Sequence, residues 1–302
     1  MRLEYIRSFI GVVNYKSFSM AAKYLFLSQP TISTHIKQLE AELGVQLLVR
    51  STKDVILSEE GLKFYPYALQ LLETEKQALS QLNKKEKSIG ETVTLVMSSV
   101  PGCYVFPEFL QYFRERYKDI NFRTLEGDSE NVLQKILHFD AEIGIGSIQS
   151  YSDKVHCEAL FEDEIILITP NEEKYRSLKG DFPLALLKKE TFIARELGSG
   201  TKNVTENVER MLGLDTATLN VVAQFGSSEV VRRAVEAGNG IAFISKMAAK
   251  EALEQKKILE FRFPNINANR QIYLLYHKER VLSQAAQHVI DSIKEYCAEK
   301  YN

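Results

Sequence analysis

The sequence lacks several features that would assign it quickly to a class of protein. Its 302 residues include no tryptophan and only three cysteines, Cys103, Cys157 and Cys297. The number is odd, no Cys-x-x-Cys pair occurs, and no histidine stands at metal-ligand spacing from a cysteine. We therefore expect neither a disulfide framework nor a zinc site. We expect no metal, and we expect each cysteine to be a buried or half-buried thiol.

Long apolar runs and a strong net charge are also missing. No uncharged apolar stretch approaches the roughly 20 residues that span a bilayer. Charged residues break up the first 17 positions, where a signal peptide needs an uncharged core. The net charge of −2 excludes a uniformly basic nucleic-acid coat, so any DNA contact must come from a local group of cations. We expect a cytoplasmic protein without membrane contact.

Enzyme signatures are absent from the sequence as well. We find no phosphate-binding loop of the Gly-x4-Gly-Lys-Ser/Thr type, no His-Glu-x-x-His and no Gly-x-Ser-x-Gly. Gly198-Ser199-Gly200 is too short to indicate a nucleophile, and the five histidines are dispersed. We therefore expect no catalysis and no cofactor.

Helical periodicity and capping residues do occur at the N-terminus. Apolar residues from Leu3 to Val13 follow i, i+3, i+4 spacing and predict a first helix. Ser19 is predicted to cap a short second helix, 20–25. Ser28 is predicted to cap a third, with Pro30 in its first turn and Gly44 at its end.

The outward face of the predicted third helix is polar and small, which suits base edges in the major groove. Two short strands are predicted within 45–57, around the polar turn 51–54, and this wing would place cations at its tip. The candidate DNA contacts are Ser28, Gln29, Pro30, Thr31, Ser33, Thr34, His35, Lys37, Arg50 and Lys53. A solvated helix face is the alternative interpretation of the same residues.

A long helix with one apolar seam is predicted after Ser58. Alternating three and four spacing predicts that this seam meets a second copy of the chain, and Pro66 predicts a kink or an irregular start. The seam residues are Leu62, Tyr65, Leu69, Leu72 and Leu79. The polar segment 84–90 closes with glycine and is the predicted domain boundary.

Strands and helices alternate from residue 91 onward, which predicts two α/β lobes. The predicted strands are Thr92–Met97, Asn121–Leu125, Ala141–Gly146, Ile165–Thr169, Thr191–Arg195, Leu219–Phe225, Ile241–Ser245 and Ile272–Tyr276. The predicted helices are Val105–Tyr117, Ser129–Phe139, Lys202–Leu212, Ser228–Ala237 and Ala285–Lys300.

The N-terminal segments resemble the helix-turn-helix signature of the LysR-type transcriptional regulators. The resemblance covers 17–25, 28–33 and 39–50, and Leu57-Ser58-Glu59-Glu60-Gly61 resembles the family's wing exit. Segments 127–129, 140–145 and 234–245 resemble recurring parts of its effector domain. Thr34 departs from the family's usual arginine, so base preference cannot be transferred.

This resemblance implies an α/β protein with three parts. They are a winged helix-turn-helix over 1–58, a dimerisation linker helix and hinge over 59–90, and a two-lobed effector-binding domain, similar to periplasmic binding proteins, over 91–302. Lobe I is predicted at 91–164 and 268–302, and lobe II at 165–267. The implied partners are double-stranded operator DNA, a small-molecule effector and further copies in a homodimer or homotetramer, with RNA polymerase as another candidate.

The ligand site is predicted where strand ends meet helix N-termini, because unpaired N–H groups converge there. Small hydroxyls and glycines at those points suit a small anion or an amino-acid-like metabolite. The segment 195–201 resembles the corresponding segment of LysR-type regulators of sulfur assimilation. The candidate contacts are Ser98, Ser99, Val100, Gly102, Ser129, Gly146, Ser147, Glu196, Ser199, Thr201, Phe225 and Gly226.

Alternatives remain open at this point. Ser199 and Thr201 could simply cap the following helix. Cys103 could tune a redox response, although a packed thiol is the simpler interpretation. A transport receptor would need export, and an architectural DNA binder would leave some two hundred residues of α/β domain without a role.

Overall fold

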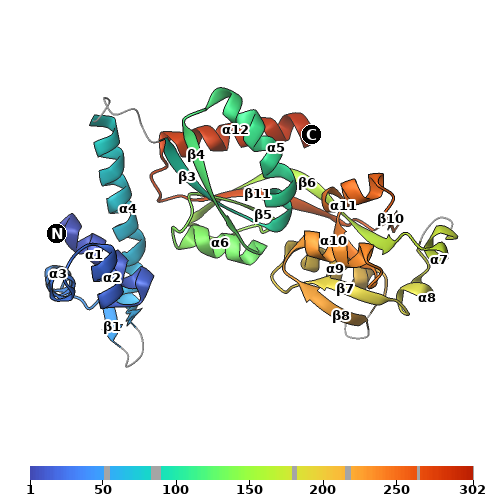
Figure 1. Ribbon diagram of the computed structural model, residues 1–302, viewed down its shortest axis with the longest axis horizontal. Coiled ribbons are helices and arrows are strands. Elements are labelled where there is room, and N and C mark those ends of the chain that lie inside the picture. The colour runs from blue at the N-terminus through green and yellow to red at the C-terminus, as the bar shows by residue number, and fades with distance from the viewer. Residues whose placement is uncertain (51–54, 83–89, 179–181, 215–218, 264–265, 302) are drawn as a thin grey trace. The chain divides into compact units, whose positions relative to one another are not determined.

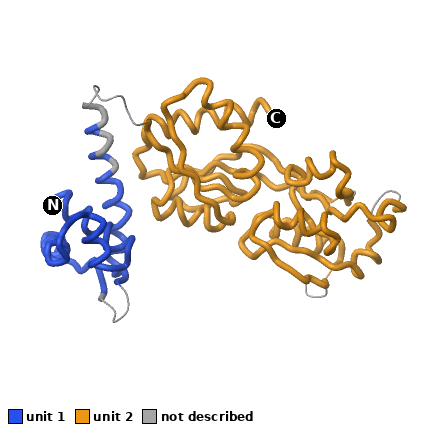
Figure 2. Tube along the Cα trace, viewed as in Figure 1, with its two compact units in different colours: residues 1–88 blue, residues 89–302 orange. Residues whose placement is uncertain are grey.

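The computed structural model describes residues 1–50, 55–82, 90–178, 182–214, 219–263 and 266–301. The chain forms two compact units, residues 1–88 and 89–302 (Figure 2). Each unit has its own core. No helix within the described ranges is both long enough and apolar enough to cross a membrane.

Unit 1 is a three-helix core with a two-stranded wing and a long helix. Its elements are α1 (Leu3–Tyr15), α2 (Phe18–Tyr24), α3 (Gln29–Leu43), β1 (Leu48–Arg50), β2 (Val55–Leu57) and α4 (Glu59–Leu82). The predicted cap of α3 is confirmed, because Ser28 Oγ accepts from the Thr31 N–H at 3.2 Å. Gly44 ends the helix with a φ of 72°, in the left-handed region that favours glycine.

Two predictions for unit 1 are corrected. Ser17, not Ser19, caps α2 by accepting from the Met20 N–H at 3.3 Å, and Phe18 then packs against the core as the first helical residue. Helix α4 begins regularly at Glu59 and continues through Pro66, so the start is not irregular; the alternative, a kink at Pro66, stays a prediction. The predicted wing turn, 51–54, and most of the predicted linker lie outside the described residues.

Lobe I of unit 2 contains β3 (Glu91–Met97), β4 (Ile120–Glu126), β5 (Ile143–Gly146) and most of β11 (Asn269–His277). Strands β4, β3 and β5 are parallel, and β11 joins β5 antiparallel. A π-helical turn, η1 (Pro101–Val105), leads into α5 (Phe106–Arg116); α6 (Ser129–Leu137) and α12 (Gln284–Tyr301) complete the lobe (Figure 1).

The long strand β6 (Val155–Pro170) joins the two lobes. It pairs with β11 as far as Glu164 and, from Ile165 on, with β9 (Ala242–Ser245) and β10 (Ile258–Phe261). The sequence predicted only its second half, because acidic residues interrupt the apolar pattern of the first. Strands β6 and β11 run side by side between the lobes (Figure 1), and their pairing connects lobe I to lobe II.

Lobe II is completed by parallel strands β7 (Thr191–Arg195) and β8 (Asn220–Phe225). Its helices are α7 (Glu173–Arg176), α8 (Leu184–Leu187), α9 (Gly200–Met211), α10 (Ser228–Glu236) and α11 (Lys246–Glu254). The sequence missed α7, α8, α11 and β10, of which α7, α8 and β10 are only four residues long. The alternating order that predicted an α/β protein is confirmed.

Candidate functional site

The exposed start of α3 carries the polar side chains that the sequence selected for DNA contact. Ser28, Gln29 and Pro30 are exposed, Thr31 is half-buried and Thr34 is exposed again one turn later. The Ser28 and Thr31 hydroxyl oxygens lie 2.7 Å apart, and Thr34 donates to the Pro30 carbonyl at 2.9 Å. These hydroxyls are held by the helix itself, which fixes the side chains in place.

Gln29 is held from a neighbouring helix. Ser19 of α2 donates to Gln29 Oε1 at 2.9 Å. Because this bond uses the amide oxygen, the Gln29 amide N–H groups can donate to another acceptor. Ser19 therefore contributes to the orientation of Gln29 rather than to the cap of α2. A glutamine oriented in this way can present a donor pair to a base edge.

His35 does not share the exposed face of α3. Its Nδ1 lies 2.8 Å from Oγ of Ser8, which is fully buried on α1, and its ring centroid lies 5.0 Å from that of Tyr5. His35 is half-buried, and its ring is engaged with Ser8 and Tyr5 of α1 rather than directed away from the helix core. We remove it from the set of candidate DNA contacts.

Substitution of His35 tests this placement. We expect His35→Ala to lower the free energy of unfolding of unit 1 by about 1–3 kcal/mol, because it leaves the buried Ser8 hydroxyl without its partner. His35→Gln offers a replacement hydrogen bond and should lose less. Urea unfolding of the full chain measures both, with exposed Gln38→Ala as the control. Equal stability of His35→Ala and Gln38→Ala would contradict the placement.

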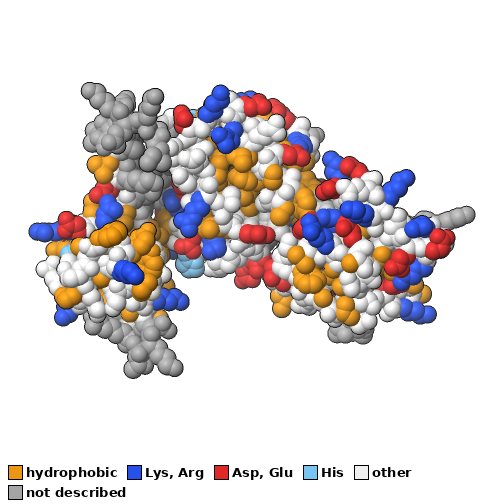
Figure 3. Space-filling model, in the orientation of Figure 1, with side chains coloured by type: hydrophobic (Ala, Val, Ile, Leu, Met, Phe, Trp, Pro, Cys, Tyr) orange, Lys and Arg blue, Asp and Glu red, His pale blue; other side chains and the backbone are white. Residues whose placement is uncertain are grey.

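Positive charge is sparse around the DNA-facing residues. The first 65 residues carry about two more cations than anions. Lys37 is exposed, the Arg50 side chain and Lys53 lie outside the described part of the chain, and Ser33 is half-buried. Lys and Arg side chains are interspersed with Asp and Glu on the face shown in Figure 3. Few phosphate contacts per subunit are therefore expected.

The apolar seam predicted for α4 is divided between two surfaces. Tyr65, Leu69 and Leu72 pack against the core of unit 1, and Tyr65 donates to Asn14 of α1 at 2.8 Å. The expectation that the whole seam meets a second copy is therefore wrong, because α1 supplies a cover within the chain. Exposed apolar side chains remain along α4 at Leu62, Tyr67, Leu71 and Leu79.

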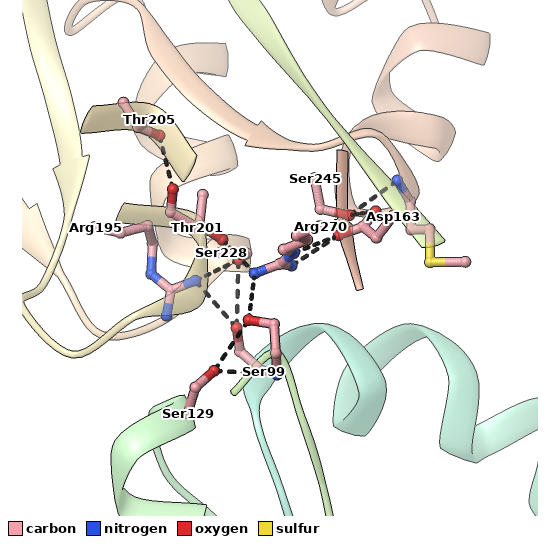
Figure 4. A network of polar contacts seen from close by, with 11 residues as sticks. Ser99, Ser129, Asp163, Arg195, Thr201, Thr205, Ser228, Ser245 and Arg270 are labelled. Atoms are coloured by element: carbon pink, nitrogen blue, oxygen red, sulfur yellow. Dashed lines mark hydrogen bonds and ion pairs between the residues drawn. The ribbon is translucent and has the colours of Figure 1, made fainter. Parts of the chain in front are cut away.

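A buried cluster of polar side chains lies where the two lobes of unit 2 meet, and we call it the interlobe cluster (Figure 4). Arg195, at the end of β7, is its centre. Its Nη1 donates to Ser228 Oγ at 2.6 Å and to Ser99 Oγ at 3.2 Å. Its Nε and Nη2 donate to the carbonyls of Phe225 and Gly226 at 3.1 and 2.7 Å.

All the acceptors of Arg195 are neutral. Among the residues that the structure describes, no carboxylate forms an ion pair with it, although its side chain is almost fully buried. Burial and the nearby Arg270 lower the pKa of Arg195 to about 10. The guanidinium therefore stays charged at neutral pH. Glu196, Asp128 and Glu126 attract it without forming an ion pair, so this end of β7 holds a buried cation whose direct partners are all neutral.

Arg270 of β11 is the second buried cation of the interlobe cluster, and it is paired. Its Nε and Nη2 each lie 2.8 Å from Asp163 Oδ2 on β6, and Ser245 donates to Asp163 Oδ1 at 2.6 Å. Its Nη1 reaches across to Thr201 Oγ1 at 2.9 Å and Ser147 Oγ at 3.4 Å. Arg270 thus touches both lobes from the strands that join them.

Several of the predicted ligand contacts take part in this cluster, and the others lie close to it in the chain. Ser129 Oγ lies 3.1 Å from Ser147 Oγ, and a Cβ on Gly200 would lie 1.5 Å from Ser147 Oγ, so only glycine fits there. Ser99, Ser147, Thr201 and the carbonyls of Phe225 and Gly226 take part directly. Ser98 and Val100 are buried on either side of Ser99, and Ser199 is buried at the start of α9. Gly146 ends β5, and Gly102 lies within η1. Glu196 approaches Gly226.

The alternative role of Ser199 and Thr201 as helix caps is not borne out. Ser199 occupies the cap position of α9, but its side chain makes no capping hydrogen bond. The Thr201 hydroxyl accepts from Arg270 instead. Cys103 is exposed rather than packed. The parts of the protein around its thiol still remove some water from it, and this desolvation, together with Glu126 and Glu229, raises its pKa, which disfavours a reactive thiolate.

Sequence reasoning missed the charged residues of the interlobe cluster. Arg195 was assigned to a strand and to the segment 195–201 but was not selected as a ligand contact, and neither were Asp163, Ser228, Ser245 and Arg270. A cation at the end of an apolar strand, as in Thr-Phe-Ile-Ala-Arg, is one signal that points to Arg195. Asp163 and Arg270 lie 107 residues apart and become partners only through the pairing of β6 and β11.

Two family models match the chain. The model described as "LysR substrate binding domain" matches residues 87–298, and "Bacterial regulatory helix-turn-helix protein, lysR family" matches residues 3–62. The HTH-type transcriptional regulator CysL of Bacillus subtilis (strain 168) is 26% identical over 276 residues, which is 91% of each protein.

Similar solved structures extend over almost the whole chain. ArgP from Mycobacterium tuberculosis has a TM-score of 0.78 at 17% identity, covering 99% of this chain and 98% of that one. Full-length CbnR complexed with its target DNA has a TM-score of 0.65 at 17% identity, covering 98% and 99%. At these identities the structures establish the shared fold.

Proposed function

Because the chain belongs to the LysR family of DNA-binding transcriptional regulators, we propose that it binds operator DNA as a dimer or tetramer under the control of a small anion. The family is one of regulators rather than enzymes. The observation that carries the ligand part of the proposal is Arg195, a buried cation with neutral partners only. We place this activity in the cytoplasm, where operator DNA is accessible.

Base selection is assigned to the start of α3. Gln29 and Thr31 supply donors and a methyl group for base edges, with Thr34 beside them. Ser28, Ser33, Lys37 and the wing residues Arg50 and Lys53 are proposed to contact phosphates, which position the protein without reading sequence. The solved structure of full-length CbnR complexed with its target DNA, which shares this fold, supports a DNA complex for this chain.

Oligomerisation is assigned to the exposed apolar residues of α4. Leu62, Tyr67, Leu71 and Leu79 would be covered by the same helix of a second copy. The sparse positive charge of one subunit favours this arrangement, because two subunits double the number of phosphate contacts. Half-sites about one helical turn apart would follow from the two-fold symmetry of such a dimer.

The proposed ligand is a small anion, such as an oxyanion or the carboxylate of an amino-acid-like metabolite. Arg195 Nη1 already holds two hydroxyl groups, and a ligand oxygen carrying charge would bind it more strongly than either neutral oxygen. Ser99 belongs to lobe I and Ser228 to lobe II, so exchange of these contacts for a ligand would change how the lobes are held. A change in how the lobes are held is the proposed route by which the ligand controls DNA binding.

Arg195→Gln tests the ligand site. We expect a thermal-shift screen of sulfate, phosphate and small carboxylates to find an anion that stabilises the wild-type chain. An anion at 100 times its Kd adds about 2.7 kcal/mol to stability. Arg195→Gln should abolish this response and leave DNA binding intact. Exposed Arg233→Gln, also in lobe II, is the matched control. A stabilising anion that binds Arg195→Gln as tightly as wild type would refute the assignment.

Genome-wide footprinting followed by gel shifts tests DNA binding. We expect salt-sensitive, sequence-selective binding, and we expect Gln29→Ala to lower selectivity by about 1–3 kcal/mol at one base position. Exposed Glu42→Ala, at the far end of α3, is the control. The absence of any sequence-selective binding by the wild-type chain would contradict the proposed function.

A further inference from the structure

We infer that Glu209 is a proton-binding site inside lobe II, whose ionisation loosens helix α9. The side chain of Glu209 is only 3% exposed, and its Oε2 has no hydrogen-bond partner among the described residues. It lies two turns beyond Thr201 on the buried face of α9, with Thr205 between them. None of the roles proposed above uses this carboxyl group.

Glu209 lines a small cavity between α9 and strands β7, β8 and β9. The cavity has a volume of about 20 Å³, and apolar residues including Phe192, Leu219, Val221 and Phe243 form much of its wall. A space of this size holds about one water molecule. One water cannot replace the hydration of a carboxylate, so the site stabilises the neutral acid.

The charged groups around Glu209 do not neutralise it. On α9, Lys202 attracts the Glu209 carboxylate, but it lies 3.6 Å from Glu206, which competes for it. Arg195 of β7 lines the cavity and directs its guanidinium to Ser99 and Ser228.

The remaining charged residues of the strands against α9 have partners of their own. Arg270 is paired with Asp163, and Glu164 of β6 is paired with Lys246 and Arg262. Burial, acting against the attraction of Lys202, raises the pKa of Glu209 above its ordinary value.

The direction of the pH effect follows from this raised pKa. The folded state binds the proton more tightly than an opened state in which Glu209 meets water. Stability is therefore greatest at low pH and is lost as pH rises from the ordinary carboxyl pKa through the folded one. Between the ordinary carboxyl pKa and the folded one, each additional pH unit favours opening by up to tenfold; above the folded pKa both states are ionised and the pH dependence levels off.

The consequence for ligand control rests on the proposed function, whereas the proton site itself does not. Helix α9 begins in the interlobe cluster, where Thr201 accepts from Arg270. Loosening of α9 would displace Thr201 and weaken the ligand site. Proton uptake by Glu209 would then favour the ligand-bound form, so regulation would respond to pH.

Hydrogen exchange of the full chain without ligand tests the proton site. We expect protection of 200–211, corrected for intrinsic exchange, to fall at least fivefold between pH 5 and pH 8 in the wild-type chain. Glu209→Gln keeps the shape of the neutral acid and should remove most of this fall. Glu173→Gln, an exposed acid elsewhere in lobe II, should behave as wild type. A pH-independent wild type, or an unchanged fall in Glu209→Gln, would overturn the inference.

A second measurement decides the matter if Glu209→Gln does not fold. The ¹³C resonance of the Glu209 carboxyl in the wild-type chain should titrate with a midpoint above the ordinary value of about 4.3. A midpoint at or below that value would overturn the inference. Failure of every anion to bind would instead overturn the proposed ligand site and leave these two results standing.

Discussion

Asp163→Ala is expected to lower the free energy of unfolding of unit 2 by about 3–5 kcal/mol, because it leaves the Arg270 guanidinium buried without its counter-charge. Asp163 is almost fully buried and accepts from both Arg270 and Ser245. This large loss of stability comes from the Arg270 charge that stays buried without a partner, and it does not measure the strength of the Asp163–Arg270 pair. Urea unfolding of the full chain, followed by circular dichroism, measures the change.

An exposed ion pair provides the control for Asp163→Ala. Arg116 and Glu295 lie 2.6 Å apart, but both side chains are about half exposed. Glu295→Ala should therefore cost less than about 1 kcal/mol. The double variant Asp163→Leu with Arg270→Met removes both buried charges and should recover most of the lost stability. If Asp163→Ala is as stable as Glu295→Ala, the buried pair does not hold the strands as described.

Gly61→Ala is expected to disrupt unit 1, although Gly61 lies in the first turn of a helix. By helix propensity alone, alanine would be favoured by about 1 kcal/mol. The added Cβ would lie only 2.0 Å from the Leu47 carbonyl oxygen, which already accepts from the Ser58 N–H. Because backbone cannot move aside as a side-chain end does, we expect a net loss of about 1–3 kcal/mol or more.

The consequence of Gly61→Ala for function should follow its effect on stability. The contact joins α4 to the segment before the wing, so the wing and the start of α4 should separate. We expect weaker operator binding in gel shifts and a lower urea midpoint for unit 1. Glu60→Ala, an exposed neighbour in the same turn, should change neither by much. Normal stability of Gly61→Ala would show that α4 can shift away from Leu47.

Local signals account for what could be predicted about the site. The candidate DNA contacts of α3 follow from a cap at Ser28 and an apolar stripe, both of which are properties of consecutive residues. His35 was misplaced because the sequence does not show that Ser8 of α1 reaches it. The candidate ligand contacts were selected because glycines and hydroxyls mark loops that precede helices, and their role stays a prediction.

The sequence by itself determined the helix-turn-helix, the α/β order of the rest and the family, because caps, periodicity and motifs are carried by residues close together in the chain. Only the tertiary structure decided which charges are buried together. Asp163 meets Arg270, and Arg195 meets Ser99 and Ser228, through strand pairing and lobe contact over long sequence separations. The free energy of such groups depends on burial and on the partner that folding supplies, and neither is written in the local sequence.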